Sequence, residues 1–277
     1  MSSRKEHVKK ILGDKYELIS FLGGGDFGRV WKAKSKKDGK LYAIKQRKFL
    51  DEDLGDVDDL FERQVNAKIR HENVIEIHEH LRVGRENFLV MEYCDGGNLE
   101  DRIEDMRKGE EDISEDSAKS IIQQICYGLK ALHEAGYYHR NLDPRNILIS
   151  GDKVIIGDLG LIKKSLQKSS NVMGSAQYIP LEQQVRDKES GIFNADLRSD
   201  IFAVGTIFYE LLSGGKRPFR EAKDDIELIG LKRDKRYIDN LKIEGADEGY
   251  LKIIKKCLQP NPDDRYQSVQ ELLDDLG

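Results

Sequence analysis

Apolar and polar residues alternate along residues 16–46 of this chain, and glycines interrupt the alternation. Alternation places apolar side chains on one face of a strand, so it predicts consecutive antiparallel strands joined by glycine-containing turns. A short apolar run at residues 88–91 is typical of another, buried strand. The first third of the chain is therefore expected to form an antiparallel sheet.

The remaining two thirds of the chain show mainly helical spacing. Ser114 is a favourable N-cap, and apolar residues follow it at helical intervals until Gly136. Residues 147–149 and 153–156 predict a short hairpin. The stretch from Asp200 to residue 212 is apolar around most of its circumference, as in a helix at the centre of a packed region. These patterns predict an α+β fold.

Composition narrows the class of protein. The 277 residues include 51 acidic and 46 basic side chains, and the net charge of -5 argues against nucleic-acid binding. No apolar run reaches the length of a membrane span, and the first ten residues lack the apolar core of a signal peptide. We therefore expect a cytoplasmic protein with no membrane partner. The three cysteines are widely spaced and are expected to be reduced.

A glycine run supplies the first candidate chemistry. Gly23, Gly25 and Gly28 have the spacing G-x-G-x-x-G and are followed by Val30. In a dinucleotide-binding fold such glycines open a helix, whereas here the strand pattern continues to Lys45. The glycines would let backbone amides approach phosphate oxygens, to which Lys45 would bring a positive charge. A phosphate-binding hairpin is favoured, and a glycine-rich hairpin without a ligand is the alternative.

A second motif lies in the middle of the chain. Residues 138–146 read Y-H-R-N-L-D-P-R-N, and Asp158 follows twelve residues after Asn146. With the glycine run, this stretch resembles the catalytic loop and metal-binding turn of protein kinases. In that family, the Asp of H-R-D-L-x-x-x-N accepts the substrate's hydroxyl proton, and the Asn and the later Asp hold Mg²⁺. The resemblance runs from Tyr16 to the end and implies that the chain binds ATP and Mg.

The resemblance also implies a bilobal arrangement and a set of site residues. After a polar lead-in at residues 1–14, it places an N-lobe of sheet plus one helix at 15–93 and a mainly helical C-lobe at 94–277. Met91 would border the adenine, the backbone of Glu92 and Cys94 would bond it, and Glu62 would orient Lys45. The implied nucleotide-contacting residues are Leu22, Gly23, Gly25, Gly28, Val30, Ala43, Lys45, Glu62, Met91, Glu92, Cys94 and Leu148. The implied metal ligands are Asn146 and Asp158.

Further resemblances concern the segment after the metal-binding turn. Residues 161–173 would form the activation segment, and residues 174–182 resemble its closing stretch in Ser/Thr kinases. Asp200 would brace the catalytic loop, and Glu182 would pair with Arg265, a pair whose loss would cost ~3–5 kcal/mol if it is buried. Residues 198–200 are similar to bacterial-type Ser/Thr kinases. Candidate phosphorylation sites are Ser165, Ser169 and Ser170.

The chain departs from the family where phosphoryl transfer takes place. Asn141 occupies the position of the catalytic base, and an amide cannot take a proton at neutral pH. Asp143 stands where Ser/Thr kinases have Lys, and its carboxylate would repel the γ-phosphate unless a metal ion or Arg145 offsets it. Asn66 is polar where kinases usually place an apolar residue. General-base catalysis is typically worth ~10²–10⁴-fold, while the positioning and charge neutralisation on which transfer mainly depends look intact.

Three hypotheses about function remain. The first is a pseudokinase that binds ATP and Mg and acts as a switch or scaffold, and the residues at positions 66, 141 and 143 together favour it. The second is an active Ser/Thr protein kinase in which Asp143 is a substitute base. The third is an Asp-to-Asn inactivated form of an active Ser/Thr kinase, which leaves Asp143 and Asn66 without an explanation. The sequence does not identify a protein substrate or binding partner.

Overall fold

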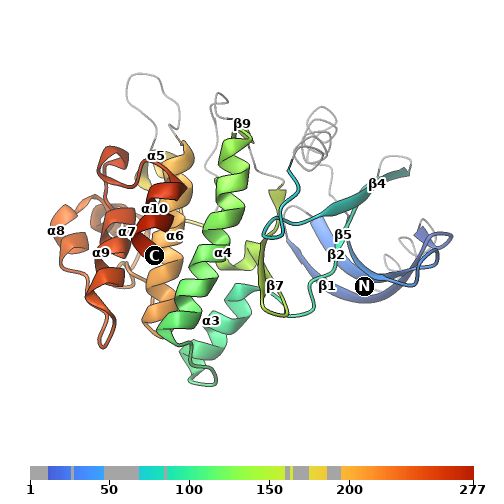
Figure 1. Ribbon diagram of the computed structural model, residues 1–277, viewed down its shortest axis with the longest axis horizontal. Helices are drawn as coiled ribbons and strands as arrows, with labels where there is room; N and C mark the ends of the chain where they lie inside the picture. Colours follow the sequence, from blue (N-terminus) through green and yellow to red (C-terminus); the bar gives the residue numbers. More distant parts are fainter. Residues whose placement is uncertain are drawn as a thin grey trace. The chain divides into compact units, whose positions relative to one another are not determined.

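A computed structural model describes residues 12–25, 28–46, 69–83, 86–159, 163–164, 175–185 and 195–277 (Figure 1). The chain divides into two compact units. The N-terminal unit comprises Met1–Arg70 and Ile75–Asp95, and the C-terminal unit comprises His71–Val74 and Gly96–Gly277. Several sequence predictions lie outside the described residues: the helix with Glu62 and Asn66, and Ser165, Ser169 and Ser170.

The N-terminal unit contains the predicted antiparallel sheet. Its five strands have the spatial order β1-β2-β3-β5-β4, and every neighbouring pair is antiparallel. The strands are β1 (Tyr16–Gly25), β2 (Gly28–Ser35), β3 (Leu41–Gln46), β4 (Ile77–Val83) and β5 (Glu86–Glu92). The alternation seen in residues 16–46 therefore marks the real strands β1, β2 and β3. The β1–β2 and β4–β5 pairs contain register shifts.

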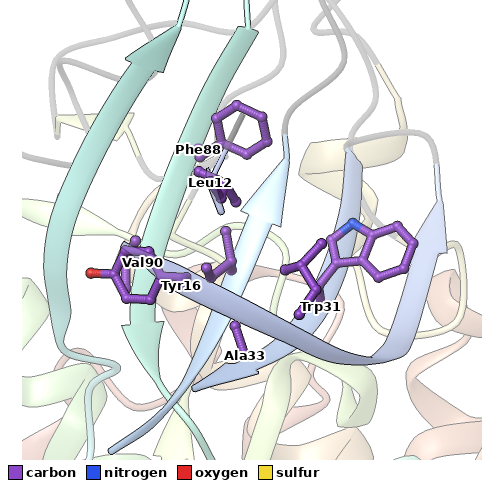
Figure 2. Close-up of a cluster of buried hydrophobic side chains, with 8 residues drawn as sticks. Leu12, Tyr16, Trp31, Ala33, Phe88 and Val90 are labelled. Atoms are coloured by element: carbon purple, nitrogen blue, oxygen red, sulfur yellow. The ribbon is translucent and has the colours of Figure 1, made fainter. Parts of the chain in front are cut away.

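One face of this sheet forms a hydrophobic core (Figure 2). Trp31 on β2, Ile44 on β3 and Val90 on β5 are register partners across three strands, so their side chains share this face. The cluster as a whole comprises Leu12, Tyr16, Leu18, Trp31, Ala33, Ile44, Phe88 and Val90. Leu12 precedes the first strand and is 3% exposed, a contribution that the sequence pattern did not indicate.

The described part of the C-terminal unit is mainly helical (Figure 1). Its α-helices are α3 (Leu99–Lys108), α4 (Glu115–Glu134), α5 (Leu181–Gln184), α6 (Leu197–Leu212), α7 (Asp225–Arg233), α8 (Lys235–Asp239), α9 (Glu248–Cys257) and α10 (Val269–Leu276). Two strand pairs accompany them: β6 (Tyr137–Tyr138) with β9 (Lys163–Lys164), and β7 (Ile147–Ser150) with β8 (Lys153–Ile156). The predicted α+β class, with an antiparallel sheet followed by helices, is confirmed.

Helix α6 is the centre of this unit. Its residues from Ser199 to Leu211 are buried, and it packs against α4 and α9. The sequence placed its start at Asp200, which is wrong by three residues. Asp196 is the N-cap and accepts a hydrogen bond from the Arg198 backbone nitrogen, so the helix begins at Leu197.

The two other predicted C-terminal elements form as expected. Ser114 caps α4 by accepting a hydrogen bond from Ser117 N. Strands β7 and β8 form the predicted hairpin, and Gly151 in its turn has a φ of 57°. Within the described residues, none of the helices is long and apolar enough to cross a membrane.

Candidate active site

The glycine run forms a strand hairpin. Gly23 pairs with Val30, and Gly25 pairs with Gly28, across β1 and β2. Leu22 is 45% exposed and lies where the register of β1 shifts between Phe21 and Gly23. Because β2 follows the glycines directly, the helix required by a dinucleotide-binding loop is not formed there.

The sheet positions Lys45 through register and alternation. Val30 is the register partner of Lys45, and Ala43 is the register partner of Met91. Because side chains alternate along a strand, these four residues share the face opposite Ile44 and the core of Figure 2. Lys45 is 7% exposed on that face. The sheet therefore gathers four of the residues that the sequence assigned to a nucleotide.

Two hydrogen bonds between Glu92 and Glu76 hold the end of β5. Glu92 donates its backbone N–H to Glu76 O at 3.0 Å, and its carboxylate accepts a hydrogen bond from Glu76 N at 2.8 Å. These two bonds fix the strand end that leads to Cys94. Burial, reinforced by the negative charges of Glu92 and Asp95, raises the pKa of the Cys94 thiol to about 12. The thiol therefore stays protonated at neutral pH.

In the C-terminal unit, Asp200 holds the catalytic loop, as the sequence predicted. Its Oδ1 accepts a hydrogen bond from Arg140 N at 2.7 Å, and its Oδ2 accepts one from His139 N at 2.9 Å. His133 Nε2 lies 2.8 Å from the same Oδ2. Burial opposes ionisation of Asp200, but the hydrogen bond and charge of His133 hold its pKa below the ordinary value. A fixed carboxylate thus anchors two successive backbone amides.

These anchors support an unusual backbone conformation at Arg140. Its φ is 61°, in the left-handed region, where a residue other than glycine costs ~1–3 kcal/mol. Arg140 Nη2 donates to Ala195 O at 3.0 Å, and Gln183 Nε2 donates to Arg140 O at 2.9 Å. Bonds on both sides of the residue therefore stabilise the turn that presents Asn141.

Two hydrogen bonds, one from the Asn146 side chain and one between backbone groups, bring the metal-ligand candidates together. Asn146 Nδ2 donates to Asn141 O at 2.8 Å, and Gly157 N donates to Asn146 O at 2.7 Å. A Cβ on Gly157 would lie 3.1 Å from Leu148 Cδ1, so glycine permits this close approach. The next residue, Asp158, has a φ of 50°. Asn146 and Asp158 therefore occupy neighbouring positions.

The side chains of Asn146 and Asp158 carry the oxygen types that Mg²⁺ prefers. The Asn146 amide nitrogen is committed to Asn141 O, so its amide oxygen takes no part in that bond, and carboxylate and amide oxygens suit Mg²⁺. Across the described residues, no group of three His, Cys, Asp or Glu forms a ready metal cluster. A magnesium ion here would need further oxygens from water and phosphate, which is its usual mode of binding.

Asp143 and Arg145 form a local ion pair. Asp143 Oδ1 accepts a hydrogen bond from Arg145 N at 2.9 Å, and Arg145 Nη2 lies 2.6 Å from Oδ2. The Asp143 side chain is 4% exposed and the Arg145 side chain 62%. The hydrogen bond to Asp143 raises the pKa of Arg145. Both carboxylate oxygens are therefore engaged by one neighbour, which offsets their charge.

The predicted pair of Glu182 and Arg265 is confirmed. Arg265 Nη1 lies 2.7 Å from Glu182 Oε1, and Nη2 lies 3.1 Å from Oε2, in a two-pronged arrangement. The Arg265 side chain is fully buried, and that of Glu182 is 11% exposed. Ser199 Oγ adds a hydrogen bond of 3.0 Å to Oε1. This pair joins α5 to the C-terminal part of the unit.

Sequence reasoning missed a buried lysine near α5. Lys232 on α7 donates to Ala176 O at 2.5 Å and to Ile179 O at 2.6 Å, and its side chain is fully buried. Burial lowers its pKa to about 7. Lys232 begins the charged run K-R-D-K-R at residues 232–236, so composition gave no sign of its burial. Its spacing of four from the buried Leu228 was the available signal.

A second missed group is the buried carboxylate of Glu210 on α6. Tyr178 Oη donates to its Oε2 at 2.8 Å, and Arg107 Nη2 lies 3.1 Å from its Oε1. Burial raises the pKa of Glu210 to about 7, although Tyr178 and Arg107 oppose this shift. The tyrosine before α5 is thereby fixed to the central helix.

The comparisons with known proteins define the family. A family model described as the protein kinase domain matches residues 16–275. The chain therefore belongs to the protein kinase family, whose members typically use ATP and Mg. This agrees with the hairpin at the glycine run and with the Asp200-anchored loop.

The curated proteins that resemble this chain include several named as serine/threonine-protein kinases. The chain is 29% identical over 284 residues to a probable serine/threonine-protein kinase of Clostridium perfringens, covering 97% of this chain and 39% of the relative. It is 33% identical over 228 residues to serine/threonine-protein kinase ATG1a of Arabidopsis thaliana, covering 79% and 34%. It is 27% identical over 285 residues to serine/threonine-protein kinase PknB of Mycobacterium leprae, covering 96% and 43%. The chain thus spans about two fifths of the length of these relatives.

Proposed function

We propose that this chain is a protein kinase domain that binds ATP with Mg²⁺, transfers phosphate poorly or not at all, and acts as a switch or scaffold. The observation that carries the proposal is Asn141, an amide at the base position of a loop that is otherwise fully braced. Asp200 anchors the two residues before it, and Asn146 bonds its carbonyl. The loop is thus held in place by hydrogen bonds, but residue 141 has an amide where a carboxylate would accept the proton.

Each unit carries its own set of residues for the proposed binding of ATP and Mg²⁺. The proposed N-lobe comprises residues 15–93. There, one face of the sheet carries Val30, Ala43, Lys45 and Met91, and we propose that this face contacts ATP. Lys45 would balance phosphate charge, and the glycine hairpin would offer backbone amides. In residues 94–277, Leu148 would border the base and Asn146 with Asp158 would hold the metal. When bound, Mg²⁺ would neutralise phosphate charge.

The cost of the missing base follows from general principles. A positioned general base typically contributes ~10²–10⁴-fold to a rate, or roughly 3–5.5 kcal/mol of the activation barrier. Positioning and charge neutralisation supply most of the remaining acceleration in phosphoryl transfer. Restoring a carboxylate with Asn141→Asp is therefore expected to raise the transfer rate by about that factor.

The contacts of Asp143 weigh against its service as a substitute base. Its carboxylate is buried, caps the turn at Pro144–Asn146, and is paired with Arg145 through both oxygens. Both of its oxygens already accept hydrogen bonds from Arg145, so neither is free to receive a proton from a substrate hydroxyl. Transfer through Asp143 would first need Arg145 to move away. The active-kinase alternative therefore predicts that Asp143→Asn abolishes transfer by the unmodified chain.

The remaining alternative is an Asp-to-Asn inactivated form of an active Ser/Thr kinase. It also predicts activity in Asn141→Asp, because Asn and Asp are nearly isosteric. The pairing of Asp143 with Arg145 favours the pseudokinase over this alternative. Position 143 also departs from the Lys of Ser/Thr kinases, and its carboxylate is held by a neighbour, which a single Asp-to-Asn change at position 141 does not explain. Serine or threonine in a protein would be the acceptor of any residual transfer, by likeness to the kinases named above.

The test pairs a binding assay with a transfer assay on purified protein. Thermal shift with ATP and Mg²⁺ measures binding, and radiolabelled ATP measures transfer to the chain itself and to a basic test protein. Lys45→Met should remove the thermal shift, whereas Lys34→Met, at an exposed position on β2, should keep it. Transfer by the unmodified chain that Asp143→Asn eliminates would contradict the proposal. Loss of all ATP binding in the unmodified chain would contradict it equally.

A further inference from the structure

The backbone of residues 176–179 is held from α7. Lys232 donates to the carbonyls of Ala176 and Ile179 at 2.5 and 2.6 Å, and its side chain is fully buried. Its Nζ also lies 5.4 Å from the centre of the Phe202 ring and 5.8 Å from that of Phe219. A lysine that is buried against carbonyls and aromatic rings is fixed in one geometry. It therefore determines where these two carbonyls lie.

The same two carbonyls are linked to α5. Gln184 Nε2 donates to Ala176 O at 2.8 Å and to Ile179 O at 2.8 Å. Lys232 and Gln184 thus approach one pair of acceptors from two helices. A displacement of the carbonyls would have to break bonds to α7, to α5, or to both.

The adjacent residue of α5 contacts the catalytic loop. Gln183 is buried, and its Nε2 donates to Arg140 O at 2.9 Å. That carbonyl belongs to the peptide bond between Arg140 and Asn141. The bond therefore connects α5 to the residue at the base position, in a loop whose Arg140 already adopts a left-handed conformation.

We propose that Lys232 and Gln183 are positioning residues: Lys232 fixes residues 176–179 and α5, and Gln183 carries that position to the Arg140–Asn141 peptide. The proposal deepens the proposed function, because it names what sets the geometry of the same catalytic loop. Neither residue touches a reacting atom. Their effect is on the placement of residue 141, so they should govern the rate of transfer and leave ATP affinity unchanged.

The first test needs no activity and uses the otherwise unmodified chain. Amide hydrogen exchange is compared for Lys232→Met and Gln183→Met, which keep side-chain length and remove the donor. Both should speed exchange in residues 139–146 by about tenfold or more. Gln183→Met removes a buried hydrogen bond to the loop itself, and Lys232→Met removes the bonds that hold residues 176–179, and through them α5, in place. Arg233→Met changes an exposed neighbour on α7 and should leave exchange there unchanged. Unchanged exchange at 139–146 in both donor variants overturns the proposal.

The second test uses the Asn141→Asp background, where the proposed function predicts measurable transfer. There Lys232→Met and Gln183→Met should lower kcat about tenfold or more with KM for ATP within about twofold, whereas Arg233→Met should change neither. A kcat equal to that of Asn141→Asp alone in both variants overturns the proposal. If Asn141→Asp transfers nothing, the proposed function fails, and the positioning role is decided by hydrogen exchange. If Lys232→Met does not fold, Gln183→Met decides both tests.

Discussion

Replacing Glu182 with glutamine tests the ion pair that joins α5 to the C-terminal part of the unit. The substitution keeps the size and shape of the side chain and removes its charge. Arg265 would remain with a fully buried guanidinium group. Its other bonds, to Gln259 O at 2.8 Å, Arg198 O at 3.0 Å and Pro260 O at 3.2 Å, are to neutral carbonyls that cannot balance its charge.

The magnitude follows from the burial of both partners. Breaking a buried ion pair by neutralising one member typically costs 3–5 kcal/mol, because the other charge is left uncompensated. Glu182 is 11% exposed and both of its oxygens are bonded to Arg265, so we expect about 3 kcal/mol or more. With a urea slope of ~2–3 kcal/mol/M, the unfolding midpoint should fall by about 1 M or more.

The assay is urea unfolding followed by circular dichroism, with Asp263→Asn as the control. Asp263 pairs with Arg198 at 2.6 Å, but its side chain is 76% exposed. An exposed ion pair is worth ~0–1 kcal/mol, so the control should shift the midpoint little. A Glu182→Gln variant that is no less stable than Asp263→Asn would show that Glu182 does not balance the buried charge of Arg265.

Three further predictions concern other parts of the chain. Lys232 has a pKa of about 7 in the folded protein and ~10.4 when unfolded, so the unfolded state binds more protons between these values and stability should rise with pH above 7. The unfolding free energy should rise by at most ~1.4 kcal/mol per pH unit, and this rise should disappear in Lys232→Met. If denaturant titrations of Lys232→Met show the same pH dependence as the unmodified chain, Lys232 is not its cause. Gly205→Ala should destabilise the protein by ~1–3 kcal/mol, because the added Cβ would lie 2.4 Å from Cys257 Cβ. A Cβ at Gly230 meets nothing within 4 Å, so Gly230→Ala should stabilise α7 by up to ~1 kcal/mol. Unfolding midpoints equal to that of the unmodified chain would contradict both predictions. Cys94 should react with iodoacetamide at pH 8 more than about a hundred times slower than a small free thiol, and rapid alkylation detected by peptide mass spectrometry would disprove its high pKa.

Local patterns were sufficient for part of the secondary structure, and they did not place β4, α3 or the helices from α7 to α10. The β1–β2 hairpin, α4 with its Ser114 cap, and the β7–β8 hairpin each depend on residues close together in sequence. Two long-range contacts were also predicted, Asp200 with the catalytic loop and Glu182 with Arg265, because the family resemblance supplied their partners. Local spacing alone would not have paired residues 83 positions apart.

The contacts that were missed depend on tertiary packing. Lys232 lies in a charged run whose other members are exposed, and its burial depends on the carbonyls that α7 meets. The bond from Gln183 to Arg140 spans 43 residues and joins a side chain to a backbone atom, so no side-chain pattern indicates it. The sequence raised Arg145 as a partner of Asp143, and the structure adds that their pairing is through both carboxylate oxygens.

The most direct test of the central claim is the rate of phosphate transfer by the unmodified chain and by Asn141→Asp, measured at saturating ATP and Mg²⁺. Thermal shift in the same samples shows that both forms bind the nucleotide. We expect equal ATP binding by the two forms and a transfer rate in Asn141→Asp that is ~10²–10⁴-fold higher. Equal rates of transfer by the two forms would contradict it, because Asn141 would then not be what limits this kinase domain.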